Sequence, residues 1–192
     1  MAIEIINLSK SYGEKSVFDS FNCKIEEGEV TCFMGQSGNG KTTLLRILSG
    51  LEQPDGGQIT GLSDRRKSFI FQEDRLCENL SAAANIRLVC GKSLKMNSIT
   101  EAMSAAGLGA ECVYQITRTM SGGQKRRIAV LRALMAEYDI LFMDEPFKGL
   151  DNETKEKLML YTKEKIKGKT VIFVTHDKTE CEAINGNTVY NI

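Results

Sequence analysis

Apolar and polar positions along this chain form short alternating blocks, some with the period of a strand and some with the period of a helix. Apolar, β-prone blocks predict strands over residues 2–7, 17–25, 30–34, 68–71, 140–143, 170–174 and 188–192. Blocks with helical spacing predict four helices. These run from Lys41 to near Gly50, from the Ser121 cap through Met135, over 153–167 and over 178–184. This order of strands and helices predicts an α/β fold with a parallel-sheet core.

The segment from about Asp74 to Arg118 differs from the rest because it is rich in alanine and has few β-branched runs. This composition predicts a helical insert in the core. Within it, Ser98 and Glu101 have capping-box spacing, which predicts a helix start. Earlier in the chain, the Pro-Asp-Gly-Gly run at 54–57 predicts a turn.

Length and composition limit the classes of protein. A chain of 192 residues suits one domain, and its 25 basic and 25 acidic residues create no net field that would attract nucleic acid or anionic lipid. No apolar run has the length of a membrane span, and no signal-peptide pattern opens the chain. Six cysteines without a Cys-x-x-Cys motif and a single histidine argue against a zinc site, so reduced cysteines in a cytoplasmic protein are expected.

A glycine-rich run lies between the apolar block at 30–34 and the helix that follows. Glycines let backbone N–H groups turn inward, and the helix dipole adds positive potential, so this context predicts a phosphate cradle rather than an ordinary turn. Lys41 would reach the β- and γ-phosphates, and the Thr42 hydroxyl would coordinate Mg²⁺. The expected nucleotide contacts are Gly35, Gln36, Ser37, Gly38, Asn39, Gly40, Lys41, Thr42 and Thr43.

Two carboxylates, Asp144 and Glu145, directly follow the apolar strand at 140–143. Ligands of parallel sheets bind at the carboxyl ends of strands, where these side chains would lie. Asp144 is predicted to hold Mg²⁺ and Glu145 to polarise an attacking water. An acidic exit from a strand is common in α/β proteins, and only the phosphate loop earlier in the chain makes the pair informative.

A further motif runs from Met120 to Arg127, Met-Ser-Gly-Gly-Gln-Lys-Arg-Arg. Ser121 and Gln124 predict a capping box, and the bare glycines expose N–H groups as an anion site requires; both interpretations hold together. The motif resembles the signature of ABC transporter ATPases, which most often begins with Leu where this chain has Met120. That resemblance implies that Ser121, Gly122, Gly123 and Gln124 contact ATP.

The resemblance also implies a fold: a P-loop NTPase (RecA-like) core with an antiparallel β lobe and a short inserted helical lobe. We expect one ABC ATPase domain over 1–192. The core and β lobe would cover about 1–73 and 119–192, and the helical lobe about 74–135, sharing the signature helix. The short spacing between Lys41 and Met120 predicts reduced lobes, and no C-terminal regulatory domain is expected.

Four more positions match the family in order. Tyr12 lies where an aromatic stacks on adenine, and stacking is favoured over the alternative of an ordinary half-buried tyrosine. Gln72 matches the glutamine that touches Mg²⁺ and the attacking water, and His176 the histidine that contacts the γ-phosphate. Asp151 matches a loop that crosses to a second subunit, where Lys148 replaces a more usual small residue; Asp151 could also be only a helix N-cap.

The resemblance implies a function and partners. Two such subunits would dimerise head to tail, as a homodimer, with each ATP held between Lys41 of one chain and Ser121 of the other. They would dock on an integral membrane permease at the cytoplasmic face of the membrane. The run from Phe71 to Leu76 resembles importers of nitrate, taurine and aliphatic sulfonates, which implies an extracytoplasmic solute-binding protein as a further partner.

Two other functions are alternatives for a chain with this phosphate loop. A soluble ABC-type ATPase of DNA repair or translation would lack a permease, but such proteins usually carry two cassettes or a long coiled coil. A small-molecule kinase would share the phosphate loop but has no need for the Ser121–Gln124 motif or for His176.

Overall fold

Two sheets organise the chain, of which the computed structural model describes residues 1–36, 38–90 and 94–192. The larger is a five-stranded parallel sheet with the order β5-β6-β7-β3-β8. Its strands are β3 (Val30–Met34), β5 (Lys67–Ile70), β6 (Ile140–Asp144), β7 (Thr170–Val174) and β8 (Thr188–Asn191). The predicted parallel-sheet core is therefore confirmed.

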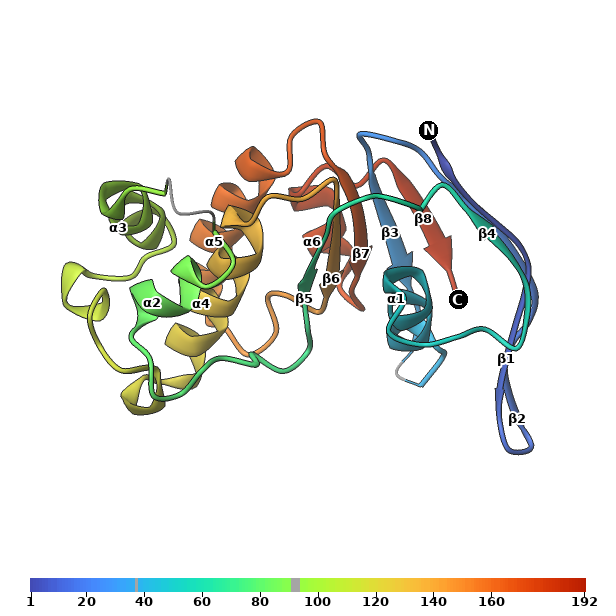
Figure 1. Ribbon diagram of the computed structural model, residues 1–192, viewed down its shortest axis with the longest axis horizontal. Helices are drawn as coiled ribbons and strands as arrows, with labels where there is room; N and C mark the ends of the chain where they lie inside the picture. Colours follow the sequence, from blue (N-terminus) through green and yellow to red (C-terminus); the bar gives the residue numbers. More distant parts are fainter. Residues whose placement is uncertain (37, 91–93) are drawn as a thin grey trace.

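The smaller sheet is antiparallel, with the order β2-β1-β4, and lies at one end of the molecule (Figure 1). It consists of β1 (Ile3–Tyr12), β2 (Lys15–Ile25) and β4 (Gly56–Thr60). Helix α1 (Lys41–Ser49) lies between the two sheets and buries Leu44, Leu45 and Leu48 in a core that both sheets share. The loop that precedes α1 is thereby anchored to both sheets.

The opposite face of the parallel sheet packs against helices (Figure 1). Strand alternation explains the division, because Phe142 of β6 faces the α1 side, whereas its neighbours Leu141 and Met143 face the helical side. The helical elements are α2 (Ala82–Arg87), α3 (Met96–Ala105), α4 (Gly122–Met135), α5 (Asn152–Lys165), α6 (Lys178–Ala183) and 3₁₀ turns at Ala110–Cys112 and Thr117–Thr119. Among the described residues, no helix combines the length and the apolar character needed to cross a bilayer.

Two local predictions are wrong. Gly56 and Gly57, assigned to a turn, instead begin β4, where Gly57 has φ 93° and an added Cβ would lie 2.5 Å from the Asn7 carbonyl oxygen. Glycine is required there because β4 approaches β1 so closely. The capping box predicted at Ser98 is also absent, since α3 begins earlier, after Lys95, and has no side-chain cap.

The expectation that all cysteines are reduced is corrected for one pair. Cys32 of β3 and Cys181 of α6 form a disulfide, with their Cα atoms 6.4 Å apart and a sequence separation of 149. Both side chains are buried on the helical side of the sheet. Packing of α6 against β3 brings them together, which a search for nearby cysteine spacings could not detect.

Candidate nucleotide-binding site

A cavity of about 330 Å³ opens at the carboxyl end of the parallel sheet. Three parts of the chain that are remote in sequence contribute to its wall: the β lobe, the glycine-rich loop with the start of α1, and the segments that follow β5 and β6. The lining residues are Tyr12, Lys15, Val17, Gly38, Gly40, Lys41, Thr42, Thr43, Gln72, Asp144, Glu145, Lys148 and Val174.

The glycine-rich loop owes its shape to its glycines. Gly38 and Gly40 have φ values of 90° and 88°, in the left-handed region that disfavours side chains. An added Cβ at Gly40 would lie 2.4 Å from Val17 of β2, so this residue also allows the β lobe to approach. Ser37, one of the predicted contacts, lies outside the described residues.

Lys41 is buried at the start of α1. Its Nζ donates to the carbonyl oxygens of Gly35 and Gln36 at 2.8 and 2.7 Å. The ammonium group is thus folded over the loop, inside the cavity that Lys41 lines. Asn39 extends from the same loop and donates through Nδ2 to the Ile192 carbonyl oxygen at 3.0 Å.

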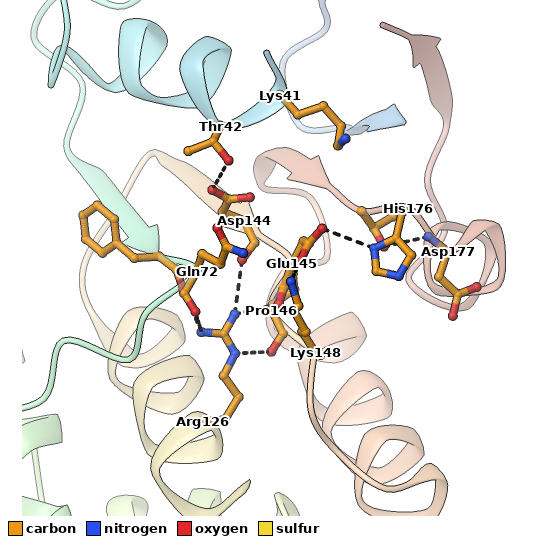
Figure 2. Close-up of polar contacts among 12 residues, drawn as sticks. Lys41, Thr42, Gln72, Arg126, Asp144, Glu145, Pro146, Lys148, His176 and Asp177 are labelled. Carbon is orange, nitrogen blue, oxygen red and sulfur yellow. Dashed lines mark hydrogen bonds and ion pairs between the residues drawn. The ribbon is translucent and has the colours of Figure 1, made fainter. Parts of the chain in front are cut away.

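Thr42 and Asp144 join the two predicted phosphate motifs. The Thr42 hydroxyl donates to Oδ2 of Asp144 at 2.8 Å, across 102 residues of sequence (Figure 2). Asp144 is buried at the end of β6, and burial raises the pKa of its carboxyl, against the Thr42 hydrogen bond that lowers it. A buried carboxylate beside a hydroxyl, with the Gln72 side chain lining the same cavity, is a donor set that suits a hard cation.

Glu145 lies one residue beyond β6, and its backbone is strained, with φ 45°. Oε1 is 3.2 Å from Nδ1 of His176, and Oε2 is 2.7 Å from Nζ of Lys148 (Figure 2). Burial raises the pKa of the Glu145 carboxyl, but Lys148 and His176 outweigh burial and hold it below its ordinary value. The His176 side chain is 61% exposed, so its ring reaches both Glu145 and solvent.

The orientation of the Lys148 ammonium leaves Oε2 of Glu145 without a hydrogen-bond donor among the described residues, although this oxygen is buried. A buried carboxylate oxygen that accepts no directed hydrogen bond and faces a polar cavity is placed to accept a proton from a bound water.

His176 is carried by a loop that is fixed by charged groups. Lys155 of α5 contacts Asp177 at 2.8 Å and the buried Glu180 at 2.6 Å, and Thr175 donates to Glu180 at 2.6 Å. The hydrogen bonds from Lys155 and Thr179 hold the pKa of Asp177 down, at about 2. This network ties the helix that follows Asp151 to the loop that carries His176. Asp151 itself caps α5 by accepting from the Thr154 amide at 3.0 Å, as the N-cap interpretation predicted.

Arg126 is a site residue that the sequence analysis missed. Its guanidinium, 6% exposed, lies on α4 beneath the cavity and donates to the carbonyl oxygens of Phe71, Pro146 and Glu145 at 2.6, 2.8 and 2.7 Å (Figure 2). It thereby joins the segment that carries Gln72 to the one that carries Glu145. The available signal was its spacing, because Arg126 lies four and eight positions before Val130 and Leu134 on the buried stripe of α4.

Tyr12 lies at the mouth of the cavity, at the end of β1, and is 49% exposed. Its hydroxyl donates to the Glu52 carboxylate, which fixes one edge of the ring. Lys10 lies beside the pair, with Nζ 5.4 Å from the ring centroid. Tyr12 therefore lines the cavity with its hydroxyl tied to Glu52 and the Lys10 ammonium over its ring.

The signature residues do not line this cavity. Ser121 and Gln124 form the predicted capping box, with hydrogen bonds of 3.2 and 2.9 Å, and this prediction is confirmed. An added Cβ at Gly122 would meet no atom within 4 Å, and at Gly123 the nearest atom would be a Leu150 methyl at 3.5 Å. The helix N-terminus at this motif is therefore largely open to an external group.

Comparison with known proteins agrees with this geometry. A family model described as ABC transporter matches residues 18–148. The aliphatic sulfonates import ATP-binding protein SsuB 2 of Paraburkholderia xenovorans is 38% identical over 94% of this chain and 72% of its own length. The sulfate/thiosulfate import ATP-binding protein CysA of Vibrio cholerae is 33% identical over 98% of this chain and 55% of its own.

Solved structures of the same kind superpose closely. The dimeric bacterial ABC transporter cassette MJ0796 gives a TM-score of 0.85 at 29% identity, covering 99% of this chain and 94% of that one. The same cassette in a post-hydrolysis state bound to ADP and Pi gives 0.84 at 28% identity, with the same coverage. The predicted ABC ATPase fold is confirmed, and this chain belongs to the ABC transporter family.

Proposed function

We propose that this chain is the ATP-hydrolysing subunit of an ABC importer and acts on a separate membrane permease. The observation that carries the proposal is the 2.8 Å hydrogen bond between Thr42 and Asp144, which joins the phosphate loop and the acidic strand end at one cavity. Glu145 lines the same cavity, and His176, which does not line it, contacts Glu145 at 3.2 Å. A site of this kind supports phosphoryl transfer to water.

Each residue has a role in the proposed reaction. Lys41 releases the carbonyl oxygens of its own loop and binds the β- and γ-phosphates, while the ring of Tyr12 stacks on adenine. Oε2 of Glu145 accepts a proton from the attacking water, and His176 contacts the γ-phosphate from the adjacent strand end. Gln72 orients the water from the segment that follows β5.

Mg²⁺ is part of the proposal. Among the described residues, no three His, Cys, Asp or Glu side chains gather into a metal site, so the protein offers too few ligands by itself. Thr42 and Asp144 supply a hydroxyl and a carboxylate, to which phosphate oxygens and waters would be added, as Mg²⁺ prefers. When bound, the ion neutralises charge that develops on the phosphates.

A second subunit would complete the site. Ser121, Gly122 and Gly123 lie off the cavity at an open helix N-terminus, which suits binding of a γ-phosphate from another molecule. We infer a head-to-tail homodimer whose closure depends on ATP and whose opening follows hydrolysis. The dimeric form of the similar cassette supports this arrangement.

Import is supported by the relatives, whose names specify import of sulfonates and of sulfate or thiosulfate. We infer that the chain binds its permease at the cytoplasmic face of the membrane and serves an extracytoplasmic solute-binding protein. The alternative of a soluble ABC-type ATPase without a permease is not favoured, because these relatives are transport proteins. Relatives named for different solutes leave the solute of this chain unassigned.

The test is Glu145→Gln, which keeps the shape of the side chain and removes the base. Hydrolysis should fall by roughly 100-fold or more, whereas ATP should still bind. With the γ-phosphate retained, size-exclusion chromatography in ATP and Mg²⁺ should show a dimer that ADP does not support. Adding Ser121→Arg should abolish that dimer, and a Glu145→Gln protein that hydrolyses ATP at the wild-type rate would contradict the assignment.

A further inference from the structure

Lys148 is a cation of the nucleotide cavity to which the proposed reaction assigns no role. Its Nζ lies 2.7 Å from Oε2 of Glu145, the oxygen that would accept the proton of the attacking water. A turn produces this contact, because the Lys148 amide donates to the Glu145 carbonyl oxygen at 3.2 Å and returns the side chain over the carboxylate. In Figure 2, His176 reaches Glu145 from the segment that follows β7, whereas Lys148 belongs to the segment after β6 that also carries Glu145.

The contact is electrostatic. Oε2 has no hydrogen-bond donor among the described residues, so the ammonium lies beside the oxygen without using its lone pair in a well-directed bond. A water that approached Oε2 would compete with the ammonium group, which lies 2.7 Å from this oxygen. The attraction between Lys148 and Glu145 therefore opposes placement of the water.

Competing charge can break the contact between Lys148 and Glu145. The Lys148 side chain is 53% exposed, although that of Glu145 is only 12% exposed, so solvent and competing charge reach the ion pair from the lysine side. Gly149 follows with φ 78°, and an added Cβ there would meet no atom within 4 Å, so the backbone beside Lys148 is unobstructed. A bound Mg²⁺–triphosphate brings net negative charge into the cavity that Lys148 lines, and this charge competes with Glu145 for the ammonium.

We propose that Lys148 is a positioning residue that restrains Glu145 and competes with the attacking water for Oε2, a competition that bound triphosphate weakens without ending. This inference rests on the proposed role of Glu145 as the base. It gives the subunit a low basal rate of hydrolysis that depends on one removable ion pair.

The experiment measures steady-state ATP hydrolysis by the purified chain, with kcat and KM determined separately. Lys148→Met keeps the length of the side chain and removes the charge, so kcat should rise about twofold to fivefold, the range that loss of one exposed ion pair supports. KM should change less than twofold, because the phosphates keep Lys41. Lys148→Arg keeps the positive charge, so its kcat should stay at the low wild-type value.

Lys157→Met is the matched control. Lys157 is equally exposed, at 53%, and forms an exposed ion pair with Glu153 on α5, outside the cavity. This variant should leave kcat unchanged. A rise in kcat equal to that of Lys148→Met would assign the effect to total charge and overturn the inference.

The remaining outcomes separate this inference from the proposed function. A Lys148→Met protein with unchanged or lower kcat, or with a several-fold higher KM, would show that Lys148 does not restrain the base. Glu145→Gln combined with Lys148→Met should be as inactive as Glu145→Gln alone, and a faster double variant would mean that Lys148 acts elsewhere. If Glu145→Gln alone keeps wild-type hydrolysis, the proposed function fails and this inference fails with it.

Discussion

Arg126 holds Glu145 by its backbone, with a guanidinium nitrogen 2.7 Å from the Glu145 carbonyl oxygen. The side chain of Glu145 therefore contacts Lys148 and His176, while its main chain is held by Arg126 of α4. Because the same guanidinium also binds the Phe71 carbonyl oxygen, the segment before Gln72 and the strand end at Glu145 share one anchor. The signature helix therefore reaches the cavity through its buried face.

Arg126→Met should destabilise the protein. The substitution removes the Arg126 donor from the carbonyl oxygens of Phe71 and Pro146, at about 1–3 kcal/mol each, so the free energy of unfolding should fall by about 3 kcal/mol. Urea denaturation followed by circular dichroism would measure the change. Arg118→Ala, at an exposed arginine of a 3₁₀ turn, is the control and should change stability by less than about 0.5 kcal/mol.

Lys41→Ala should weaken ATP binding by several kcal/mol, on the order of a buried charge-assisted hydrogen bond with its Coulomb term. The variant also loses the two contacts from Nζ to Gly35 and Gln36, so its folding is to be checked by thermal unfolding without nucleotide. Isothermal titration calorimetry measures the affinity. Equal affinity in a folded variant would contradict the phosphate-loop assignment.

Tyr12→Ala should weaken ATP binding by about 1–2 kcal/mol through lost stacking, as measured by calorimetry. Tyr12→Phe keeps the ring and loses only the hydrogen bond to Glu52 at the exposed edge, so its affinity should stay close to that of the wild type. If Tyr12→Phe weakens ATP binding as much as Tyr12→Ala does, the hydroxyl contributes more to binding than stacking does.

Asp177 should make stability depend on acid pH. Its pKa is about 2 in the folded protein, below the ordinary value of 3.8, so its contribution is present above about pH 4 and is lost as the pH falls toward 2. The contribution is about 1–2 kcal/mol, because the pair with Lys155 is partly screened by solvent. Free energies of unfolding of the wild type and Asp177→Asn, measured from pH 6 to pH 2.5, should converge at the acid end. Curves that stay parallel would contradict this role.

The site was largely predictable because phosphate chemistry requires particular residues in a fixed local order. The loop from Gly35 to Thr42 and the pair Asp144–Glu145 needed only flanking apolar strands to be placed at one sheet edge. Strands over 2–7 and 17–25 were likewise predicted from local pattern, whereas their antiparallel pairing as β1 and β2 was implied only by the family resemblance. Each of these locally predicted features depends on residues that are close together in the sequence, so it can be predicted from one sequence alone.

What could not be predicted depends on partners that are remote in sequence. The role of Gly57 as the start of β4 appears only when β1 lies against it, and the pairing of Cys32 with Cys181 only when α6 packs on β3. The contact of Glu145 with His176 needs β6 and β7 to be neighbours. For Ser98, local capping competed with packing of the residues before it, and packing determined where α3 begins.

The left-handed backbone of Glu145 has a consequence for how this chain can evolve. A non-glycine residue with φ 45° costs roughly 1–2 kcal/mol, and the proline that follows it restricts the backbone further. Glycine at this position would relieve that cost and would, under the proposed role, end turnover. Selection for heat resistance and selection for activity would therefore drive residue 145 in opposite directions, and a library screened for thermal endurance alone would accumulate well-folded proteins that no longer consume ATP.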